Sequence, residues 1–356
     1  MNKKYNLITI ISLVIVLFFL GMNHQDSGSN TPVNNNASPE AKSLLNFLYQ
    51  ISGKYILSAH HNKILAPTMW NEEVKKMTGD YPVIWGGDFN YNFGGNDPDM
   101  VRQAMIDTAK EVYKKGQIIT LMWHACYPYN GDSCSRGSIW VMDNVVPQQE
   151  WDSLTTSGTK LNNLWRAQAD NIAKYLKQLQ NENIPVLWRP YHEMNGVWFW
   201  WCQHPGEEGF AKLWKMMFDY FTNHHKLNNL IWVWNANAPR DIPGDEAYAY
   251  KDYFPGIEYV DVLASDVYHN DYKQSHHDDL LELAEGKPIS LGEVGQMPTP
   301  EILNNQPQWT WFMGWSEYLN KANKPDSVKI LYNSPRTITL NELTRNKNGS
   351  YEIHLK

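Results

Sequence analysis

The densest group of chemically reactive side chains in this 356-residue sequence lies in residues 188–201, Trp-Arg-Pro-Tyr-His-Glu-Met-Asn-Gly-Val-Trp-Phe-Trp-Trp. The segment places a cation, Arg189, an imidazole, His192, and a carboxylate, Glu193, directly after an apolar run. A structural ion pair between Arg189 and Glu193 would explain two of these charges. However, the four aromatic rings that end the segment are hard to bury beside so many polar groups, which favours a functional site.

A second carboxylate, Glu293, ends the small and apolar run Ile289-Ser-Leu-Gly. Hydrolysis of a glycosidic bond requires two carboxyl groups that flank the bond. They lie about 5 Å apart in enzymes that retain the anomeric configuration and about 6.5 to 9.5 Å apart in enzymes that invert it. Glu193 and Glu293 therefore form a candidate catalytic pair if the fold brings them together.

The elements that must position these residues follow a regular pattern. Short apolar or β-branched runs alternate with amphipathic segments, of which the clearest are residues 161–179, 210–221 and 278–284, as is typical of β/α units. We predict strands at Tyr55–Ala59, Pro82–Trp85, Ile118–Trp123, Pro185–Tyr191, Asn229–Trp234, Val260–Ala264, Pro288–Gly292 and Trp311–Trp315. Eight strands are what a closed (β/α)8 TIM barrel requires. An open doubly wound α/β sheet is the alternative, but no glycine-rich phosphate loop supports it.

In a β/α barrel the active site lies at the C-terminal ends of the strands. The two glutamates follow the fourth and seventh predicted strands, which face each other across the barrel mouth. Further polar or aromatic residues end other strands in the same way: Asp88, His124, Asp266, Tyr268 and Trp315. The sequence therefore predicts a single site at the mouth of the barrel.

Residues 189–201 resemble the acid/base motif of glycoside hydrolase family 26, which is best known for endo-β-1,4-mannanases. Residues 289–295, Ile-Ser-Leu-Gly-Glu-Val-Gly, are similar to the nucleophile strand of that family. The resemblance extends over roughly residues 40 to 335. It implies a retaining double displacement, with Glu193 as the acid/base and Glu293 as the nucleophile. It also implies a β-mannan or related plant polysaccharide, such as galactomannan or glucomannan, as the substrate, with no cofactor.

The resemblance implies further roles for residues around the two glutamates. Arg189 and Tyr268 would hydrogen-bond Glu293 and keep it anionic. His124 and His192 would contact the substrate near the bond that is cleaved.

Three more residues complete the site that the resemblance implies. Asp88 falls in the order along the chain that the family shows, and we include it among the substrate-binding residues. Trp198 and Trp315 are candidates for platforms on which sugar rings stack. Core packing is the alternative for each of these two tryptophans.

The overall composition excludes some functions. The net charge of -7 and the pI near 5.9 argue against nucleic-acid binding, which requires a basic surface. Aromatic residues make up 13% of the chain, including 16 tryptophans and 20 tyrosines. Such a content fits a large aromatic core, and it also fits a cleft lined by rings that stack on sugars.

The N-terminus is typical of an exported protein. Lys3 and Lys4 precede an apolar run over residues 7–20, so residues 1–22 are predicted to be a signal peptide or an N-terminal anchor. Residues 23–38 are predicted to be a disordered tether. Residues 39–356 would form one catalytic domain. We expect a secreted, periplasmic or surface-tethered monomer that meets the membrane only through the anchor, and the sequence does not decide whether the leader is removed.

The three cysteines allow at most one disulfide. Cys126 and Cys134 lie eight residues apart and could form a disulfide in an oxidising compartment or remain as two thiols. Cys202 is left over, and it stands where family 26 commonly has a glycine. Histidine pairs at positions 60–61, 224–225 and 276–277 do not form a metal-binding pattern, so no metal site is predicted.

Other activities remain compatible with the same scaffold. A β-1,3-xylanase or a mixed-linkage β-glucanase would keep both glutamates and change the residues that bind the sugars. A non-catalytic carbohydrate-binding barrel would have no reason to keep Glu193, Glu293 and Arg189 together. The sequence leaves open the exact polysaccharide, the number of subsites and whether cleavage is endo or exo.

Overall fold

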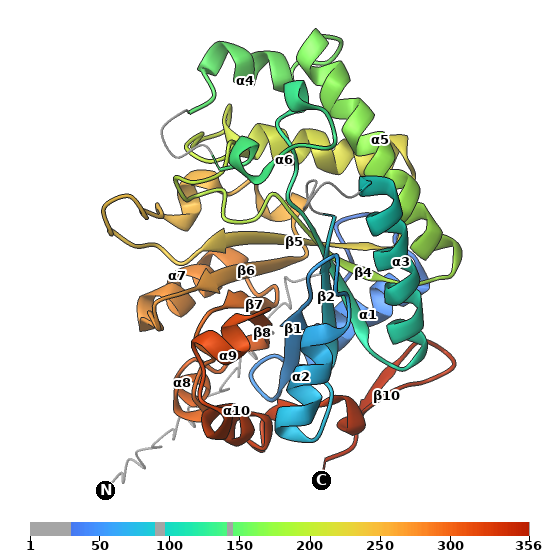
Figure 1. Ribbon diagram of the computed structural model, residues 1–356, viewed down its shortest axis with the longest axis vertical. Coiled ribbons are helices and arrows are strands. Elements are labelled where there is room, and N and C mark those ends of the chain that lie inside the picture. The colour runs from blue at the N-terminus through green and yellow to red at the C-terminus, as the bar shows by residue number, and fades with distance from the viewer. Residues whose placement is uncertain (1–29, 90–96, 141–144, 356) are drawn as a thin grey trace, which may run out of the picture.

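Eight parallel strands close into a barrel at the centre of the protein, and helices surround it (Figure 1). This computed structural model describes residues 30–89, 97–140 and 145–355. β1 pairs with both β2 and β8, and this pairing closes the sheet. The predicted (β/α)8 fold is confirmed, and each predicted strand overlaps an observed one. The barrel strands are β1 (Ile56–His61), β2 (Ile84–Asp88), β3 (Ile118–Trp123), β4 (Val186–Pro190), β5 (Leu230–Asn237), β6 (Val262–Val267), β7 (Ile289–Val294) and β8 (Trp309–Trp315).

Amphipathic helices cover the outer face of the barrel. The longest, α5, begins where the Thr159 side chain accepts a hydrogen bond from the backbone N–H of Asn162, which caps the helix. The helices are α1 (Pro39–Ile51), α2 (Met69–Thr78), α3 (Pro98–Lys114), α4 (Gln148–Thr155), α5 (Lys160–Asn181), α6 (Phe210–Asp219), α7 (Gln274–Ala284), α8 (Pro300–Asn305), α9 (Tyr318–Lys321) and α10 (Pro325–Tyr332). The π-helix Tyr220–His224 extends α6, and short strands β9 (Thr337–Ile338), β10 (Leu343–Arg345) and β11 (Tyr351–Ile353) follow α10.

Strand alternation decides which side chains reach the barrel interior. Successive residues of a strand point to opposite faces. Leu187 of β4 belongs to the apolar cluster inside the barrel, whereas Trp188 packs with the helices outside. Arg189, two residues after Leu187, therefore continues the interior row toward the mouth. The same step of two leads from Met313 to Trp315 in β8.

The N-terminal end of the barrel is covered by α1. Its apolar face packs into the interior cluster, so the opposite end is left to form the site. Residues 30–38, which the sequence analysis assigned to the tether, also lie against this end. The backbone N–H of Val33 donates to Asp261, and the side chain of Asn34 donates to the carbonyl of Leu227. These specific contacts mean that the folded domain begins before Pro39. The predicted leader, residues 1–22, lies outside the described residues.

Most of the tryptophans form the core. Twelve of the sixteen are less than 2% exposed, including Trp200 and Trp201. The expectation that the rings after Glu193 resist burial is therefore wrong. The indole N–H groups of Trp200 and Trp201 donate to the backbone carbonyls of Ala125 and His192, each at 2.8 Å, so burial costs these polar groups no hydrogen bond.

Cys126 and Cys134 form a disulfide, which decides the alternative that the sequence left open. The bond closes the segment after β3, which leads to Arg136 and Trp140. Cys202 is free and buried. In the part of the chain that the structure describes, no helix has the length and apolarity needed to span a membrane.

Candidate active site

A cleft of about 530 Å³ opens at the C-terminal ends of the strands, and both Glu193 and Glu293 line it. A second hollow of about 300 Å³ adjoins it. The two share part of their lining, so they form one continuous cleft. The shared residues are His124, Arg136, Trp140, Trp315 and Glu317.

Glu293 lies near the end of β7 and is held by an ion pair and a hydrogen bond. Nη1 of Arg189 lies 2.9 Å from its Oε1, and the hydroxyl of Tyr268 donates to its Oε2 at 2.9 Å. Burial disfavours the ionised phenol and the neighbouring carboxylates add to this, so the pKa of Tyr268 is well above its usual value. Tyr268 therefore remains a donor. The ion pair and the hydrogen bond together fix the Glu293 carboxyl group at the end of β7.

Gly292 allows this arrangement at the strand end. A Cβ at Gly292 would lie 1.8 Å from Oδ1 of Asn235. That same oxygen accepts a hydrogen bond of 3.2 Å from Nη1 of Arg189. Gly292 therefore leaves room beside Glu293 for a side chain that orients Arg189.

Glu193 lies in the turn after β4, in the left-handed region with φ of 54°. Two hydrogen bonds hold this backbone: its N–H donates to the carbonyl of Asn235 at 2.8 Å, and its carbonyl accepts one from the backbone N–H of Gly196. The thiol of Cys202 also donates to the Glu193 carbonyl, at 3.2 Å. A glycine at position 202 would lose this contact, which gives the departure from the family pattern a structural role. Backbone strain of this kind is concentrated at functional sites.

Both carboxyl oxygens of Glu193 accept hydrogen bonds. Nε1 of Trp198 donates to Oε2 at 2.8 Å, and Nδ2 of Asn237 donates to Oε1 at 2.5 Å. Burial nevertheless raises the pKa of Glu193 to about 7, and the charge of Glu293 adds to this rise. A carboxyl group with this pKa holds a proton in mildly acidic water and can release it to a substrate.

His192 lies between the two glutamates. Its Nε2 is 3.6 Å from Oε1 of Glu293 and 4.0 Å from Oε2 of Glu193. Oε1 of Glu293 and Oε2 of Glu193 therefore lie at most about 7.6 Å apart. Burial, together with the charges of His124 and Arg189, puts the pKa of His192 well below its usual value, so the imidazole is neutral.

His124 and Asp88 form a buried pair at the floor of the cleft. Nδ1 of His124 lies 2.7 Å from Oδ2 of Asp88. Burial opposes a charged imidazole, but the Asp88 carboxylate outweighs it and raises the pKa of His124. His124 lines both hollows, whereas Asp88 lines only the second. Asp88 therefore orients the His124 ring from a position outside the main cleft.

The two candidate sugar platforms differ. Trp315 lines both hollows, and the ring of His61 stacks on it at 4.0 Å, which holds it in place. Trp198 also lines the main cleft but is only 4% exposed, and its indole N–H is committed to Glu193. The geometry favours Trp315 as the platform, and Trp198 as a residue that holds Glu193. Their predicted contacts with sugar stay predictions.

Three residues after the apolar part of β5 were missed by the sequence analysis. Asn235 and Asn237 continue the interior row of that strand, and Arg240 follows it and lines the cleft. The predicted strand ended at Trp234. The alternating amides at 235 and 237 were the available signal, because polar residues at every second position mark one face of a strand.

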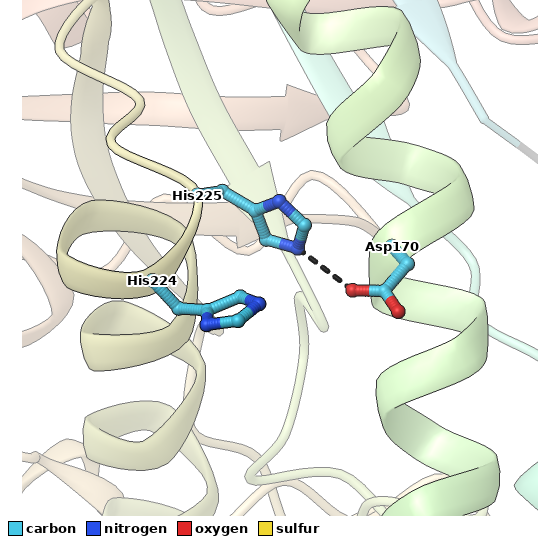
Figure 2. A group of neighbouring side chains, drawn as sticks. All are labelled: Asp170, His224 and His225. Atoms are coloured by element: carbon cyan, nitrogen blue, oxygen red, sulfur yellow. Dashed lines mark hydrogen bonds and ion pairs between the residues drawn. The ribbon is translucent and has the colours of Figure 1, made fainter.

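His224 and His225, at the end of the π-helix, face Asp170 of α5 and form a cluster that could hold a metal ion (Figure 2). Nε2 of His225 lies 2.8 Å from Oδ1 of Asp170, which also accepts a hydrogen bond of 2.7 Å from the hydroxyl of Tyr220. The His224 ring stacks on Tyr220 at 4.6 Å. These contacts tie α5 to the end of α6 and explain the cluster as a structural one. That the chain uses no metal stays a prediction.

Two glutamates line one cleft at the mouth of a (β/α)8 barrel, and paired carboxyl groups of this kind are what the hydrolysis of a glycosidic bond requires. The sequence matches the model of glycosyl hydrolase family 26 over residues 33–342. The chain belongs to this family.

Several known proteins are similar to this chain. A mannan endo-1,4-beta-mannosidase of Thermothelomyces thermophilus is 30% identical over 328 residues, which cover 88% of this chain and 64% of that protein. The structure of GH26A from Muricauda sp. MAR_2010_75 is 48% identical, with a TM-score of 0.83, and the match covers 87% of this chain and 99% of that one. The structure of a beta-mannanase from a symbiotic protist of the termite Reticulitermes speratus, complexed with gluco-manno-oligosaccharide, is 30% identical with a TM-score of 0.73, and the match covers 88% and 97%. The chain spans between half and two thirds of the length of the first curated relatives that it matches.

Proposed function

We propose that this protein is a retaining endo-β-1,4-mannanase. The observation that carries the proposal is the contrast between the two buried glutamates at the mouth of the barrel. Arg189 forms an ion pair with Glu293, and Tyr268 donates a hydrogen bond to it, so the surroundings of Glu293 stabilise a negative charge. Burial and the nearby Glu293 instead raise the pKa of Glu193 to about 7. This is the division between nucleophile and acid that double displacement requires.

The first step uses both groups at once. Glu293 attacks the anomeric carbon while Glu193 gives its proton to the departing glycosidic oxygen, and a glycosyl ester forms on Glu293. The negative charge of Glu293 is then gone, so the pKa of Glu193 falls. Glu193 can then take a proton from water, which attacks the ester and releases the product with retained configuration.

The substrate class rests on the family and on the cleft. The relatives named above include a mannan endo-1,4-beta-mannosidase and a beta-mannanase whose structure contains a gluco-manno-oligosaccharide. The two adjoining hollows meet at Trp315 and extend the cleft beyond the glutamates. A cleft that continues past the point of cleavage suits attack within a chain of β-1,4-linked mannose or mixed mannose and glucose units.

A screen of purified protein on mannan, galactomannan, glucomannan, β-1,3-xylan and mixed-linkage glucan tests the substrate. We expect hydrolysis of the three mannans, with the Glu293→Ala variant as the inactive control. Oligosaccharides of several lengths should appear early, because endo cleavage occurs at internal bonds. Preferential turnover of xylan or mixed-linkage glucan would reject the mannanase assignment and retain the hydrolase.

Stereochemistry tests the mechanism separately. Proton NMR of the first product should show the β anomer before mutarotation. An α anomer as the first product would reject Glu293 as the nucleophile.

We also propose that the protein is exported. The apolar run over residues 7–20 after two lysines supports this, as does the Cys126–Cys134 disulfide, since such bonds persist in oxidising compartments. Cell fractionation followed by N-terminal sequencing tests it. Recovery of the unprocessed chain in the cytoplasm would contradict it.

A further inference from the structure

One arginine contacts both residues that hydrogen-bond the Glu193 carboxyl group. The guanidinium of Arg240 lies over the ring of Trp198, 5.1 Å from its centroid. Its Nη1 also donates to Oδ1 of Asn237. Trp198 and Asn237 in turn donate to the two oxygens of Glu193. Arg240 is therefore linked to each oxygen of Glu193 through a different neighbour.

Arg240 is itself held firmly. Asp245 binds it at two points: Oδ2 lies 3.0 Å from Nε of Arg240, and Oδ1 lies 2.7 Å from Nη2. Such a paired geometry fixes the orientation of a guanidinium. The Arg240 side chain is 7% exposed and the Asp245 side chain 35%, so the guanidinium is largely shielded from solvent while its carboxylate partner is half-buried. A guanidinium with a fixed orientation can in turn fix the orientation of the side chains that it contacts.

The contact with Asn237 decides which end of the amide faces Glu193. An amide has one accepting oxygen and one donating nitrogen. Because Arg240 donates to Oδ1, the amide nitrogen must point the other way, toward Oε1 of Glu193. A flipped amide would oppose its N–H groups to the guanidinium and its oxygen to the carboxyl group. The backbone of Asn237 is fixed independently, since its N–H donates to Oδ1 of Asn195 at 2.7 Å.

We propose that Arg240 is a positioning residue that adjusts the proton affinity of the acid/base Glu193 through Asn237 and Trp198. Burial favours the neutral acid, whereas two N–H donors and a nearby cation favour the anion. Arg240 supports both donors and contributes the cation. It thereby makes Glu193 a stronger acid than its burial alone would allow. The inference rests on the proposed role of Glu193 as the acid/base.

Other charged or titratable groups also face Glu193, and they remain in place when Arg240 alone is changed. They come from the strand ends around the pocket: His192 after β4, Asp266 in β6, Tyr268 after it, and Glu293 in β7. Asp245, the partner of Arg240, and His269, which contacts Asp245, line the same cleft. A shift seen on substitution of Arg240 can therefore be assigned to Arg240 and the residues that it contacts, Trp198, Asn237 and Asp245.

The test compares Arg240→Met with wild type across pH. The basic limb of kcat/KM reports the acid of the free enzyme. We expect it to move to higher pH by about 0.5 to 1 unit, because one nearby cation is lost and the amide is free to turn. We expect turnover of mannan oligosaccharides, which have poor leaving groups, to fall at least tenfold. Turnover of an aryl β-mannoside with an activated leaving group should change less than threefold. Arg240→Lys, which keeps the charge, should leave the basic limb within about 0.3 units of wild type.

Arg136→Met is the matched control. The guanidinium of Arg136 lies over the ring of Trp140 at the same distance of 5.1 Å, in the same cleft, and it contacts neither Trp198 nor Asn237 in any described interaction. We expect Arg136→Met to raise KM without moving the basic limb. An unmoved limb in Arg240→Met, or equal losses on both substrate types, would overturn the proposal.

Binding separates this proposal from a direct contact with sugar. In the Glu193→Ala background, Arg240→Met should leave the Kd for mannohexaose within twofold. A tenfold weaker Kd would mean that Arg240 binds substrate, and the proposal would fail. If Glu193→Ala alone loses equal activity on substrates with good and with poor leaving groups, the proposed acid role of Glu193 is rejected. That result differs from the results that would reject the role of Arg240.

Discussion

Nη1 of Arg189 lies 2.9 Å from Oε1 of Glu293, and the two side chains are only 1% and 3% exposed. A charge pair shielded from water to this extent is strongly coupled, since removal of one partner leaves the other charge buried without compensation. Oδ2 of Asp266 lies 3.7 Å from the same guanidinium nitrogen. Burial and the charge of Glu293 hold the pKa of Asp266 well above its usual value. Arg189 therefore stabilises the charge of Glu293 beside a second carboxyl group, that of Asp266.

Replacing Arg189 with Met should lower kcat/KM by about 1,000-fold or more and destabilise the fold by about 3 kcal/mol, because Glu293 loses its cation. Steady-state kinetics on an activated aryl mannoside and urea unfolding measure the two effects. Arg102→Met is the control, since Arg102 is equally buried and pairs with Asp132 away from the cleft. The Arg102→Met variant should lose a comparable free energy of unfolding and keep the kcat of wild type. An active Arg189→Met enzyme would contradict the role given to this pair.

Replacing each of the two glutamates should impair catalysis in a different way. Glu293→Ala removes the atom that forms the covalent bond, so all substrates should lose activity by about 10,000-fold or more. Glu193→Ala should spare the first step on substrates whose leaving group needs no proton, and a burst of aryl alcohol should appear before slow hydrolysis. Stopped-flow measurement of that burst checks the assignment. Equal losses on activated and unactivated substrates in Glu193→Ala would contradict its role as the acid.

The raised pKa of Glu193 makes stability depend on pH. Folding shifts this pKa upward, from 4.5 to about 7, so the folded protein binds the proton more tightly than the unfolded chain. The resulting stabilisation is complete below pH 4.5 and is lost as the pH rises through 7. By linkage it amounts to at most about 3 kcal/mol. Glu193→Gln, which stays neutral, should match wild type near pH 5 and be the more stable protein at pH 8. Thermal unfolding at the two pH values measures this, and a constant difference between the proteins would refute it.

The Cys126–Cys134 disulfide should stabilise the wall of the cleft. It closes a short loop, and the loss of such a bond costs about 2 to 3 kcal/mol by loop-closure entropy. The double variant Cys126→Ser/Cys134→Ser should therefore unfold at lower urea concentration. Because the segment leads to Arg136 and Trp140, which line the cleft, KM should rise more than kcat falls. Reduction of wild type should reproduce both effects, and Cys202→Ser is the control. An unchanged KM in the double variant would separate the disulfide from substrate binding.

Much of the site could be predicted because its residues follow apolar runs in a simple order. Arg189, His192 and Glu193 stand together in one segment, and Glu293 ends another. A β/α alternation with eight strands leaves one place where such residues meet. The pairing of Glu293 with Arg189 and Tyr268 was expected from the family resemblance, and the distances agree with it.

The residues that hold Glu193 could not be predicted in the same way. Trp198 is of the residue type that forms sugar platforms, yet its indole N–H donates to Oε2 of Glu193. Asn237 ends β5 and Arg240 follows that strand, more than forty residues further along the chain. Nothing local in the sequence connects them to Glu193, because their contact exists only when β4 and β5 lie side by side.

The sequence by itself determined the barrel and the chemical types at its mouth, because hydrophobic period and strand-end polarity are local properties of the chain. Only the tertiary structure decided the state of each group. It buried the rings at positions 199–201 in the core, joined Cys126 to Cys134, and placed one glutamate beside a cation and the other in a desolvated pocket. Proton affinity depends on distance and burial, and both arise only when distant strands come together.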